Sequence, residues 1–334
     1  MIEPADSLSQ TPEQPEEEAS RKKRKPSGGF ECKLGLLLGL CGLAASRLGQ
    51  LWIAFDVFSQ FTLQFAVITV AFLIGWAMPR AKLLSAFVVL VLGIVAIGAW
   101  PHLASREARV LATAQPGERA FKVASFNTLW GNQNADAVKA EVERLDADLI
   151  VLIEMDRAKR PILAQLKSLY PHQFDCFGVD FCKFAVLSKL PITDTQARGR
   201  WAGPAYVMVR LGPEAGGLTV FGVHTIRFPH SRAQFRQVTE LARLIERTPG
   251  PRLVMGDFNA TPFSRILTVL QDSANLRRLT NLPSWPSHFS LPQIAIDHIF
   301  VSPGIRQLEA GQIGEPAGSD HYPVMVRIAV PLLP

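Results

Sequence analysis

Cysteine is scarce in this chain, with four residues in 334. Cys32 and Cys41 lie at or within an apolar segment, which leaves Cys176 and Cys182 as one closely spaced pair. No second Cys or His pair with the spacing of a zinc site lies near them, which argues against structural zinc. In an oxidising compartment the pair would close a small disulfide, whereas in a reducing one both thiols would stay free.

A strong charge of one sign is also missing. The formal net charge is +6, and residues 121–334 contain 23 Lys and Arg against 19 Asp and Glu. This mildly basic balance falls short of the footprint of a dedicated nucleic-acid-binding domain. Arginines do gather around one predicted strand, where they would either bind phosphate or form a solvated face: Arg198, Arg200, Arg210, Arg227, Arg232 and Arg236.

Charged side chains are absent from two long apolar segments, residues 61–78 and 83–100. Each is close to the roughly 20 residues that a helix needs to cross a bilayer. A shorter run, Leu34–Ala45, would have to extend through Arg47 to about Phe55 to span. A signal peptide would give a similar start, but the two longer segments favour a retained anchor. The sequence therefore predicts a transmembrane region of about three helices over residues 31–100.

Clustered cations predict how this region is oriented. Arg21–Lys25 and the connection Arg80–Lys82 fall on one side of the membrane if there are three crossings, and such clusters favour the cytoplasm. Residues 1–30 have too few apolar side chains for a core, and we expect a disordered cytoplasmic tail. Residues 101–120 would form a linker to an extracytoplasmic, periplasmic domain at 121–334. The protein would thus be a multi-pass inner-membrane protein, in whose oxidising outer compartment we expect the Cys176–Cys182 bridge.

Apolar, strand-like segments within residues 121–334 repeatedly end in a polar residue. A lone Asn there is usually a turn former, but an unpaired carboxylate at the rim of a core is costly unless a cation compensates it. Three strands end this way: Phe121–Phe126 before Asn127, Asp148–Ile153 before Glu154, and Val220–Val223 before His224. Three more motifs follow: Gly256-Asp257-Phe258-Asn259, Asp297 after Ile294–Ile296, and Ser319-Asp320-His321 before a predicted strand at Tyr322–Val330.

Taken in this order, the motifs resemble those of the endonuclease/exonuclease/phosphatase superfamily, which has the DNase I-like fold. The resemblance covers roughly residues 120–330, and it is specific as a set although each motif alone is weak. It implies an α+β fold, a four-layer α/β sandwich with two central mixed sheets. Helical spacing on either side of these strands agrees with flanking helices: Val138, Val142 and Leu145, then Phe235, Val238, Ala242 and Ile245.

The resemblance also implies a metal site. Glu154 and Asp320, assisted by Asn127, would hold Mg2+ or Mn2+, since these hard cations prefer oxygen ligands. The sequence has neither the soft ligands nor the clustered histidines that would suggest zinc.

Catalytic roles follow from the same resemblance. His321, oriented by Asp297, would act near the attacking water or the developing charge of the phosphorane. Asp257 and Asn259 would position the water and the phosphate, and His224 would donate to a phosphate oxygen. The general base is left open between His321 and Asp257. His298, beside Asp297, is expected to point the other way, into packing.

The predicted function is a membrane-anchored, divalent-metal-dependent phosphoesterase that hydrolyses a phosphodiester in the manner of a nuclease. A phospholipid or sphingomyelin-type phosphodiesterase or phosphatase of the same superfamily is one alternative. A non-catalytic, membrane-tethered module that binds a phosphate ligand is another. Partners would be the lipid bilayer and either nucleic acid or a phospholipid head group. The complete set of site residues favours an enzyme, while Trp130 is either an exposed cleft residue or part of the core.

Overall fold

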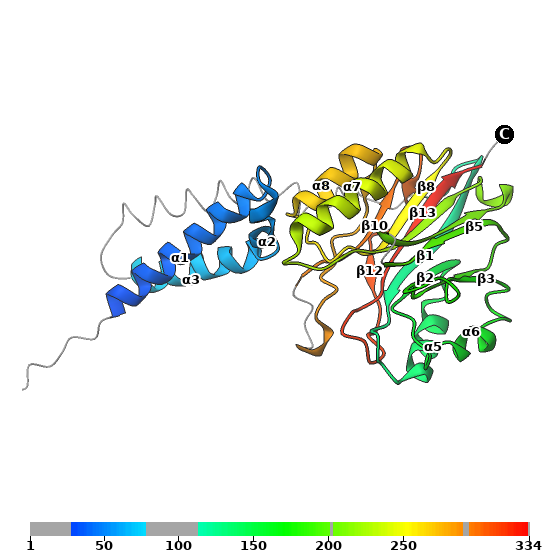
Figure 1. The fold of residues 1–334 in the computed structure, drawn as a ribbon, viewed down its shortest axis with the longest axis horizontal. Coiled ribbons are helices and arrows are strands. Elements are labelled where there is room, and N and C mark those ends of the chain that lie inside the picture. Colours follow the sequence, from blue (N-terminus) through cyan, green and yellow to red (C-terminus); the bar gives the residue numbers. More distant parts are fainter. Residues whose placement is uncertain (1–27, 78–112, 201–202, 290–293, 333–334) are drawn as a thin grey trace, which may run out of the picture.

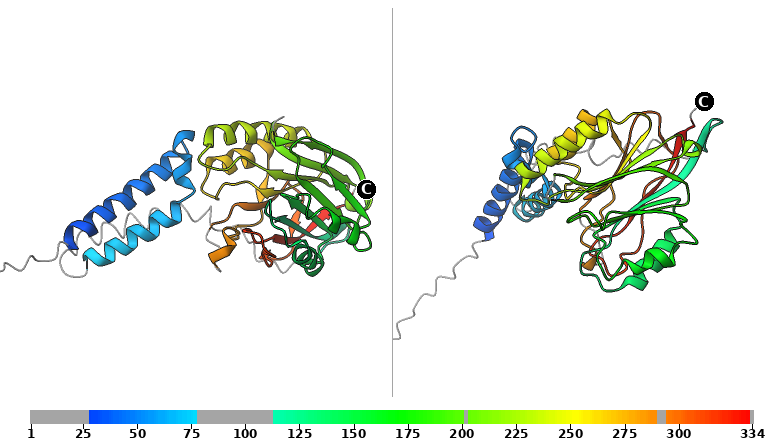
Figure 2. Two further views of the ribbon diagram at one scale, coloured as in Figure 1. Left: turned by 60° about the horizontal axis from the view of Figure 1, so that its bottom comes forward. Right: turned by 45° about the vertical axis from the view of Figure 1, so that its right-hand side comes forward.

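Two β-sheets stack face to face and carry helices on both outer faces (Figures 1 and 2). The computed structural model describes residues 28–77, 113–200, 203–289 and 294–332. Its layers run α/β/β/α, which confirms the predicted four-layer sandwich. Both sheets mix parallel and antiparallel strands, as expected from short strands that no helix separates.

The first sheet has the strand order β11-β13-β1-β2-β4-β3, and β12 pairs with β13. Neighbours β1 and β2 are parallel, and the remaining pairs are antiparallel. The first strand starts three residues before the predicted domain boundary at 121. The strands are β1 (Glu118–Asn127), β2 (Leu149–Ile153), β3 (His172–Asp175), β4 (Phe184–Ser188), β11 (Arg306–Gln307), β12 (Gln312–Ile313) and β13 (Val324–Pro331).

The second sheet has the order β5-β6-β7-β8-β10-β9. Neighbours β7 and β8 are parallel, and the remaining pairs are antiparallel. Its strands are β5 (Ile192–Arg198), β6 (Ala205–Leu211), β7 (Thr219–His224), β8 (Arg252–Asp257), β9 (Arg277–Arg278) and β10 (Asp297–Val301).

Three apolar cores explain why the central strands are apolar along their whole length. In β2, Val151 faces the core between the sheets, while Ile150 faces a second core under α5 (Ala135–Leu145) and α6 (Pro161–Gln165). A third core lies under α7 (Ser231–Arg247) and α8 (Arg265–Ala274). Alternate residues point to opposite faces, so every side chain of a strand with a core on each side is buried, and apolar residues are favoured throughout.

A helical hairpin projects from the α7 and α8 side of the sandwich (Figure 1). It consists of α1 (Gly28–Leu48) and α3 (Thr62–Ala77), joined by η1 (Ile53–Phe55) and α2 (Asp56–Ser59). A Cβ on three glycines of α1 would collide with side chains of α3: Phe72 opposite Gly35, Thr69 opposite Gly39 and Phe65 opposite Gly42. Small residues therefore let the two helices approach closely.

The described helices do not by themselves reproduce the predicted spans. No single helix among residues 28–77 combines the length and hydropathy expected of a membrane crossing. One bent pair, Ile53–Ser59 with Thr62–Ile74, meets that description when taken together, with a 58° bend between its parts. The predicted span at 83–100 lies outside the described residues.

Candidate active site

All eight predicted site residues meet at one edge of the sandwich. The carboxyl ends of the parallel strands β1 and β2, and of β7 and β8, lie at this edge. Asp257 at the end of β8 pairs with His224 on one side and with Asp297 on the other. Gly256 before it has a φ of +152°, and a Cβ there would collide with the carbonyl of Val223. The Gly-Asp-Phe-Asn motif thus needs its glycine for a close approach of two strands.

Asp257 lies at the centre of the cluster and is buried. Its Oδ2 accepts a hydrogen bond from Asn127 Nδ2 at 3.0 Å and lies 3.6 Å from His224 Nε2. Its Oδ1 accepts from the backbone N–H of Asn259 at 2.8 Å. Burial and the nearby Asp297 raise the pKa of Asp257 to about 6, against the lowering effect of His321 and His224.

Asp297 and His321 form a buried pair, in which Asp297 Oδ2 lies 2.8 Å from His321 Nδ1. Ser284 Oγ donates to the same carboxylate oxygen at 2.6 Å, so Asp297 is held from two sides. His321 Nε2 is turned toward Asn127 Nδ2 at 3.5 Å and Asp257 Oδ2 at 3.8 Å. Burial lowers the pKa of His321, but Asp297 and Asp257 outweigh it and raise the pKa to about 10.

Glu154 follows β2 with a φ of +58°. Its Oε2 accepts from the backbone N–H of Trp130 at 2.6 Å, and its Oε1 lies 3.4 Å from Asn127 Nδ2 and 3.6 Å from His224 Nε2. Burial raises the pKa of Glu154, but His224 and the Trp130 hydrogen bond more than offset this, so the pKa is lowered overall. The side chain is therefore held as an anion at the rim of the core.

Asp320 offers a second anion at the same edge. Its Oδ2 accepts from Trp285 Nε1 at 3.0 Å, while its Oδ1 is buried and has no hydrogen-bond partner among the described residues. A buried carboxylate oxygen without a donor is costly, and a cation would relieve that cost. The donor set of Glu154 and Asp320, two carboxylates without sulfur, suits a hard divalent cation.

A different group of ligand atoms lies deeper in the cluster. Asp257, Asp297 and His321 each offer one atom, and the three atoms lie within 4.8 Å of one another. However, Asp297 Oδ2 already takes the contacts from Ser284 and His321, although Asp297 Oδ1, like Asp320 Oδ1, has no hydrogen-bond partner among the described residues. This arrangement is that of a histidine held by a carboxylate, and we therefore favour Glu154 and Asp320 as the cation ligands.

A cleft of about 700 Å³ opens onto the cluster. Glu154 and Asp320 line it, as do His224, Asp257, Asn259 and His321. The lining also includes three cationic side chains, Lys183, Arg200 and Arg227, and several aromatic ones, among them Trp130, Phe181 and Phe228. Trp130 is 61% exposed, which settles its place in the cleft rather than the core. Of the six predicted arginines, two line the cleft, whereas Arg198 forms an ion pair with Glu240.

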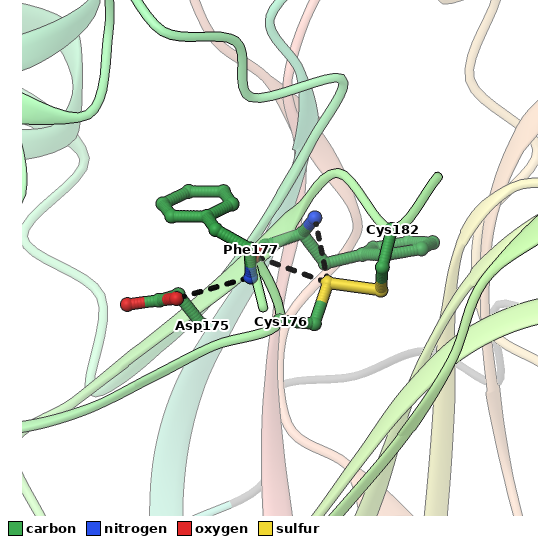
Figure 3. Close-up of a disulfide and its surroundings, with 5 residues drawn as sticks. Asp175, Cys176, Phe177 and Cys182 are labelled. Atoms are coloured by element: carbon green, nitrogen blue, oxygen red, sulfur yellow. Dashed lines mark hydrogen bonds between the residues drawn. A yellow bond between two sulfur atoms is a disulfide. The ribbon is translucent and has the colours of Figure 1, made fainter. Parts of the chain in front are cut away.

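A disulfide, drawn in Figure 3, lies next to residues that line the cleft. Cys176 and Cys182 are bonded, with their Cα atoms 5.6 Å apart, which confirms the predicted bridge. The loop that it closes carries Phe181, and Lys183 follows directly. Lys183 Nζ lies 4.4 Å from the centre of the Trp130 ring, so a cation and two aromatic rings lie together on the side of the cleft next to the bridge.

Sequence reasoning missed several supporting residues. Ser284 and Trp285, which contact Asp297 and Asp320, lie between two prolines in a segment without periodicity, so no pattern could reveal them. Lys159 is fully buried and donates to the carbonyls of Leu129 and Asn132, beneath the loop that carries Trp130. A lysine in an otherwise ordinary polar stretch gave no signal.

The prediction for His298 is confirmed, because it is buried on the far face of β10. Its Nε2 lies 2.9 Å from the carbonyl oxygen of Ala260. Burial, together with the charge of Arg278, lowers the pKa of His298 to about 3 and keeps the ring neutral.

Comparisons with known proteins agree with the fold and the motifs. A family model described as Endonuclease/Exonuclease/phosphatase family matches residues 124–321. Two UPF0294 proteins of Vibrio vulnificus, strains YJ016 and CMCP6, are each 26% identical over 117 residues, 34% of this chain. That alignment spans 40% of the length of these curated relatives.

Many solved structures share the fold, and two of them are given as examples. Sphingomyelinase C from Streptomyces griseocarneus has a TM-score of 0.50 and 17% identity, over 63% of this chain and 99% of that chain. A humanized D. rerio TDP2 has a TM-score of 0.53 and 13% identity, over 63% of this chain and 98% of that chain. At these sequence identities, both similarities show a shared fold and nothing more.

Proposed function

Because the chain belongs to the Endonuclease/Exonuclease/phosphatase family, we propose that it hydrolyses a phosphodiester by attack of an activated water, with Mg2+ or Mn2+ as its cofactor. The observation that carries this proposal is the convergence of a buried Asp297–His321 pair, Asp257 and two further carboxylates on one cleft. Turn chemistry does not require so many buried charges at one edge, because each is costly unless it is paired.

The position of each site residue suggests its role in the proposed reaction. Asp297 fixes the His321 ring so that Nε2 faces the cleft, 3.8 Å from Asp257 Oδ2. This His321–Asp257 pair would take the proton of the attacking water. His224 lies between Glu154 and Asp257, where its Nε2 would donate to a phosphoryl oxygen.

Glu154 and Asp320 would hold the cation, with Asn127 as the third candidate ligand. A bound divalent cation would polarise the phosphoryl group and stabilise the charge on the leaving oxygen. Asn127 is placed with its Nδ2 toward Asp257 and Glu154, and its Oδ1 accepts from the N–H of Leu129. Its amide would have to rotate before its oxygen could face a cation, so its first role is to orient the two carboxylates.

We further propose that residues 31–100 anchor the enzyme in the inner membrane, with the N-terminus in the cytoplasm and the catalytic domain outside. Supporting this, large apolar side chains of the hairpin are exposed, among them Leu37, Leu38, Val67 and Ile74. The uncharged segment at 83–100 and the cation clusters at Arg21–Lys25 and Arg80–Lys82 point the same way. The disulfide suits an oxidising compartment.

Nucleic acid is the first candidate substrate. Lys183, Arg200 and Arg227 give the cleft a cationic wall, and Trp130 beside it is placed to stack on a base. A phospholipid or sphingomyelin-type phosphodiester, or a phosphate monoester, is the second candidate. Phe228 lines the cleft and packs edge-on against Phe61 at the foot of the hairpin, with ring centroids 5.6 Å apart. The cleft would therefore open near the surface of the membrane.

A substrate screen with the full chain in detergent tests these proposals. Single-stranded DNA, double-stranded DNA, RNA, phospholipid vesicles and sphingomyelin vesicles would each be offered with Mg2+ or Mn2+. We expect hydrolysis of at least one diester with metal and none in EDTA, and the Asp297→Asn, His321→Ala double variant serves as the inactive control. Binding of a phosphate ligand without turnover would instead support the non-catalytic module.

A further inference from the structure

The turn of the helical hairpin touches the segment that follows the Gly-Asp-Phe-Asn motif. Ile53 packs against the core under α7 and α8. Gln50 Nε2 donates to the carbonyl of Phe263 at 2.5 Å, and Arg265 Nη1 donates to the carbonyl of Leu51 at 2.6 Å. The sequence predicts a linker between the transmembrane region and the catalytic domain. The hairpin nevertheless contacts the catalytic domain directly through these residues.

Asp56 is the centre of this interface and is fully buried. Its Oδ2 accepts from Ser264 Oγ at 2.6 Å, and its Oδ1 accepts from the backbone N–H of Arg265 at 2.7 Å. Ser264 is the N-cap of α8, and its Oγ accepts in turn from the N–H of Ile266 at 3.1 Å. The carboxylate thus completes the cap of α8 from outside the helix, where an anion also suits the helix dipole.

Gln60 makes the second link, one turn further along the hairpin. Its Oε1 accepts from the backbone N–H of Thr261 at 2.7 Å, and Thr261 Oγ1 donates to the carbonyl of Ser59 at 3.2 Å. Gln60 and Thr261 are both buried. If Gln60 or Asp56 lost its acceptor oxygen while the hairpin stayed in place, the N–H group of Thr261 or Arg265 would be left covered and without a partner, which is costly.

The segment held in this way leads directly out of the active site. Asn259 stands at a φ of +47°, and its side chain donates to the carbonyl of Thr225 at 3.1 Å. Its neighbour Ala260 contacts His298 through its carbonyl oxygen, and Gln234 Nε2 donates to the carbonyl of Asn259 at 3.1 Å. The catalytic domain thus holds one end of the segment, and the hairpin holds the other at residues 261–265.

We propose that the hairpin turn is a positioning element of the active site, in which Asp56 and Gln60 set the path of residues 260–265 and so the placement of Asn259 beside Asp257. This rests on the proposed function, since Asn259 is assigned there to the phosphate and the water. The anchor would then be required for turnover as well as for location. Asp56 and Gln60 are positioning residues, because neither touches the cleft cluster itself.

The experiment uses the full chain in detergent, with bis(4-nitrophenyl) phosphate and Mg2+ as the probe. The variants are Asp56→Ala, Asp56→Asn, which keeps one acceptor oxygen, and Gln60→Met, which keeps the volume but removes the acceptor. Asp272→Asn, an exposed carboxylate on the same helix α8, is the matched control. Rates are measured well below each variant's melting temperature, so that only folded protein is compared.

We expect Asp56→Ala to lower kcat by about 10-fold to 100-fold, the usual scale for misplaced catalytic groups, with a smaller change in KM. The kcat of Asp56→Asn should lie closer to that of the wild type. The kcat of Gln60→Met should lie between the values of the two Asp56 variants, and Asp272→Asn should have the wild-type kcat. Wild-type kcat in folded Asp56→Ala and Gln60→Met would overturn the proposal, even if both melt earlier. If Asp56→Ala does not fold, Asp56→Asn and Gln60→Met decide by the same criterion.

Amide hydrogen exchange separates this inference from the proposed function. Exchange of residues 258–266 should speed up in Gln60→Met and Asp56→Asn but not in Asp272→Asn. If the wild type hydrolyses none of the diesters, the proposed function fails, and faster exchange would show only that the hairpin orders residues 260–265. Unchanged exchange in both variants would overturn it.

Discussion

His321 Nδ1 lies 2.8 Å from Asp297 Oδ2, and Ser284 fixes that carboxylate oxygen from its other side. The ring therefore has one orientation, with Nε2 toward the cleft. His321→Ala should lower kcat/KM by roughly two to four orders of magnitude, the usual contribution of a positioned acid or base. Asp297→Asn should have a similar but smaller effect, because it leaves the ring in place and removes only its partner's charge.

The double variant tests whether the two residues act as one unit. Asp297→Asn combined with His321→Ala should cost little more than His321→Ala alone. Losses in kcat/KM that simply add, measured on any cleaved diester, would falsify the pairing. Circular dichroism and melting of each variant serve as the folding control, since both residues are buried.

Glu154 is expected to bind the divalent cation, so its substitution tests the metal dependence of the activity. Glu154→Gln keeps the shape of the side chain and the acceptor for the Trp130 N–H, but removes the charge that would hold a cation. We expect loss of most activity and a weaker apparent affinity for Mg2+ or Mn2+. Isothermal titration of the cation measures the affinity directly, and Glu143→Gln, on the exposed side of α5, is the matched control. Undiminished hydrolysis by Glu154→Gln in EDTA would exclude the proposed mechanism.

Glu118 and Arg306 link β1 to β11 and should give stability a specific dependence on pH. Arg306 donates from Nε and Nη2 to the two carboxylate oxygens, at 2.8 and 2.7 Å. These hydrogen bonds, with one from the N–H of Gln115, lower the pKa of Glu118 from 4.5 to about 2. A carboxylate whose pKa is lowered by folding stabilises the protein above its unfolded pKa, and the effect is lost as pH falls toward the folded value.

Glu118→Gln should therefore melt slightly below the wild type at pH 7, because solvent screens much of the attraction in a pair this close to the surface. This difference in melting temperature should shrink as the pH falls from 4.5, the ordinary pKa of the carboxyl, toward about 2, its pKa in the folded protein. Glu309→Gln, from the exposed pair with Arg327, is the control, because a surface pair of that kind contributes little. A gap that stays constant or widens on acidification would contradict the assignment.

The disulfide prediction concerns the cleft wall. The short loop between Cys176 and Cys182 should contribute about 2 kcal/mol to the free energy of unfolding in the chain-entropy model. The Cys176→Ala, Cys182→Ala double variant should lose that amount and also raise KM several-fold, because Phe181 and Lys183 line the cleft beside the bridge. Denaturant unfolding and steady-state kinetics measure the two effects. A normal KM with lowered stability would show that the loop serves the fold but not the substrate.

The sequence predicted those parts of the site that follow from strand ends. Asn127, Glu154, His224 and Asp257 each close a buried strand, and parallel neighbours bring such ends to one edge of a sheet. The residues that hydrogen-bond to the catalytic side chains and orient them come from segments without periodicity. Ser284 reaches Asp297 from a proline-rich loop, and no local pattern encodes that contact.

The hairpin interface was hidden for a different reason. Asp56 contacts Ser264 across 208 residues of sequence, and within an apolar run it looked like part of the connection between two spans. The same run explains the difference in the helices, since α1 ends at Leu48 and a turn at residues 49–51 leads into η1 at Ile53, instead of one helix continuing to Phe55. Tertiary contacts with α8 decide where this turn lies, and hydropathy does not report them.

Topology is the remaining prediction, and it also bears on the disulfide. The cation clusters at Arg21–Lys25 and Arg80–Lys82 should both remain in the cytoplasm, which places everything after the third predicted span outside. Alkaline phosphatase fused after Pro101 should be active in a bacterial host, whereas a green fluorescent protein at the same point should stay dark.

A variant in which the charges of the second loop are neutralised provides the matched control for topology. Replacing Arg80 and Lys82 by glutamine should weaken the signal from the second loop and lower the phosphatase activity of the Pro101 fusion, because the remaining cluster alone would set the orientation. A dark phosphatase and a bright fluorescent protein in the unmodified chain would place the domain in the cytoplasm. Since thiols are kept reduced there, that result would also remove the reason to expect the Cys176–Cys182 bridge in the cell.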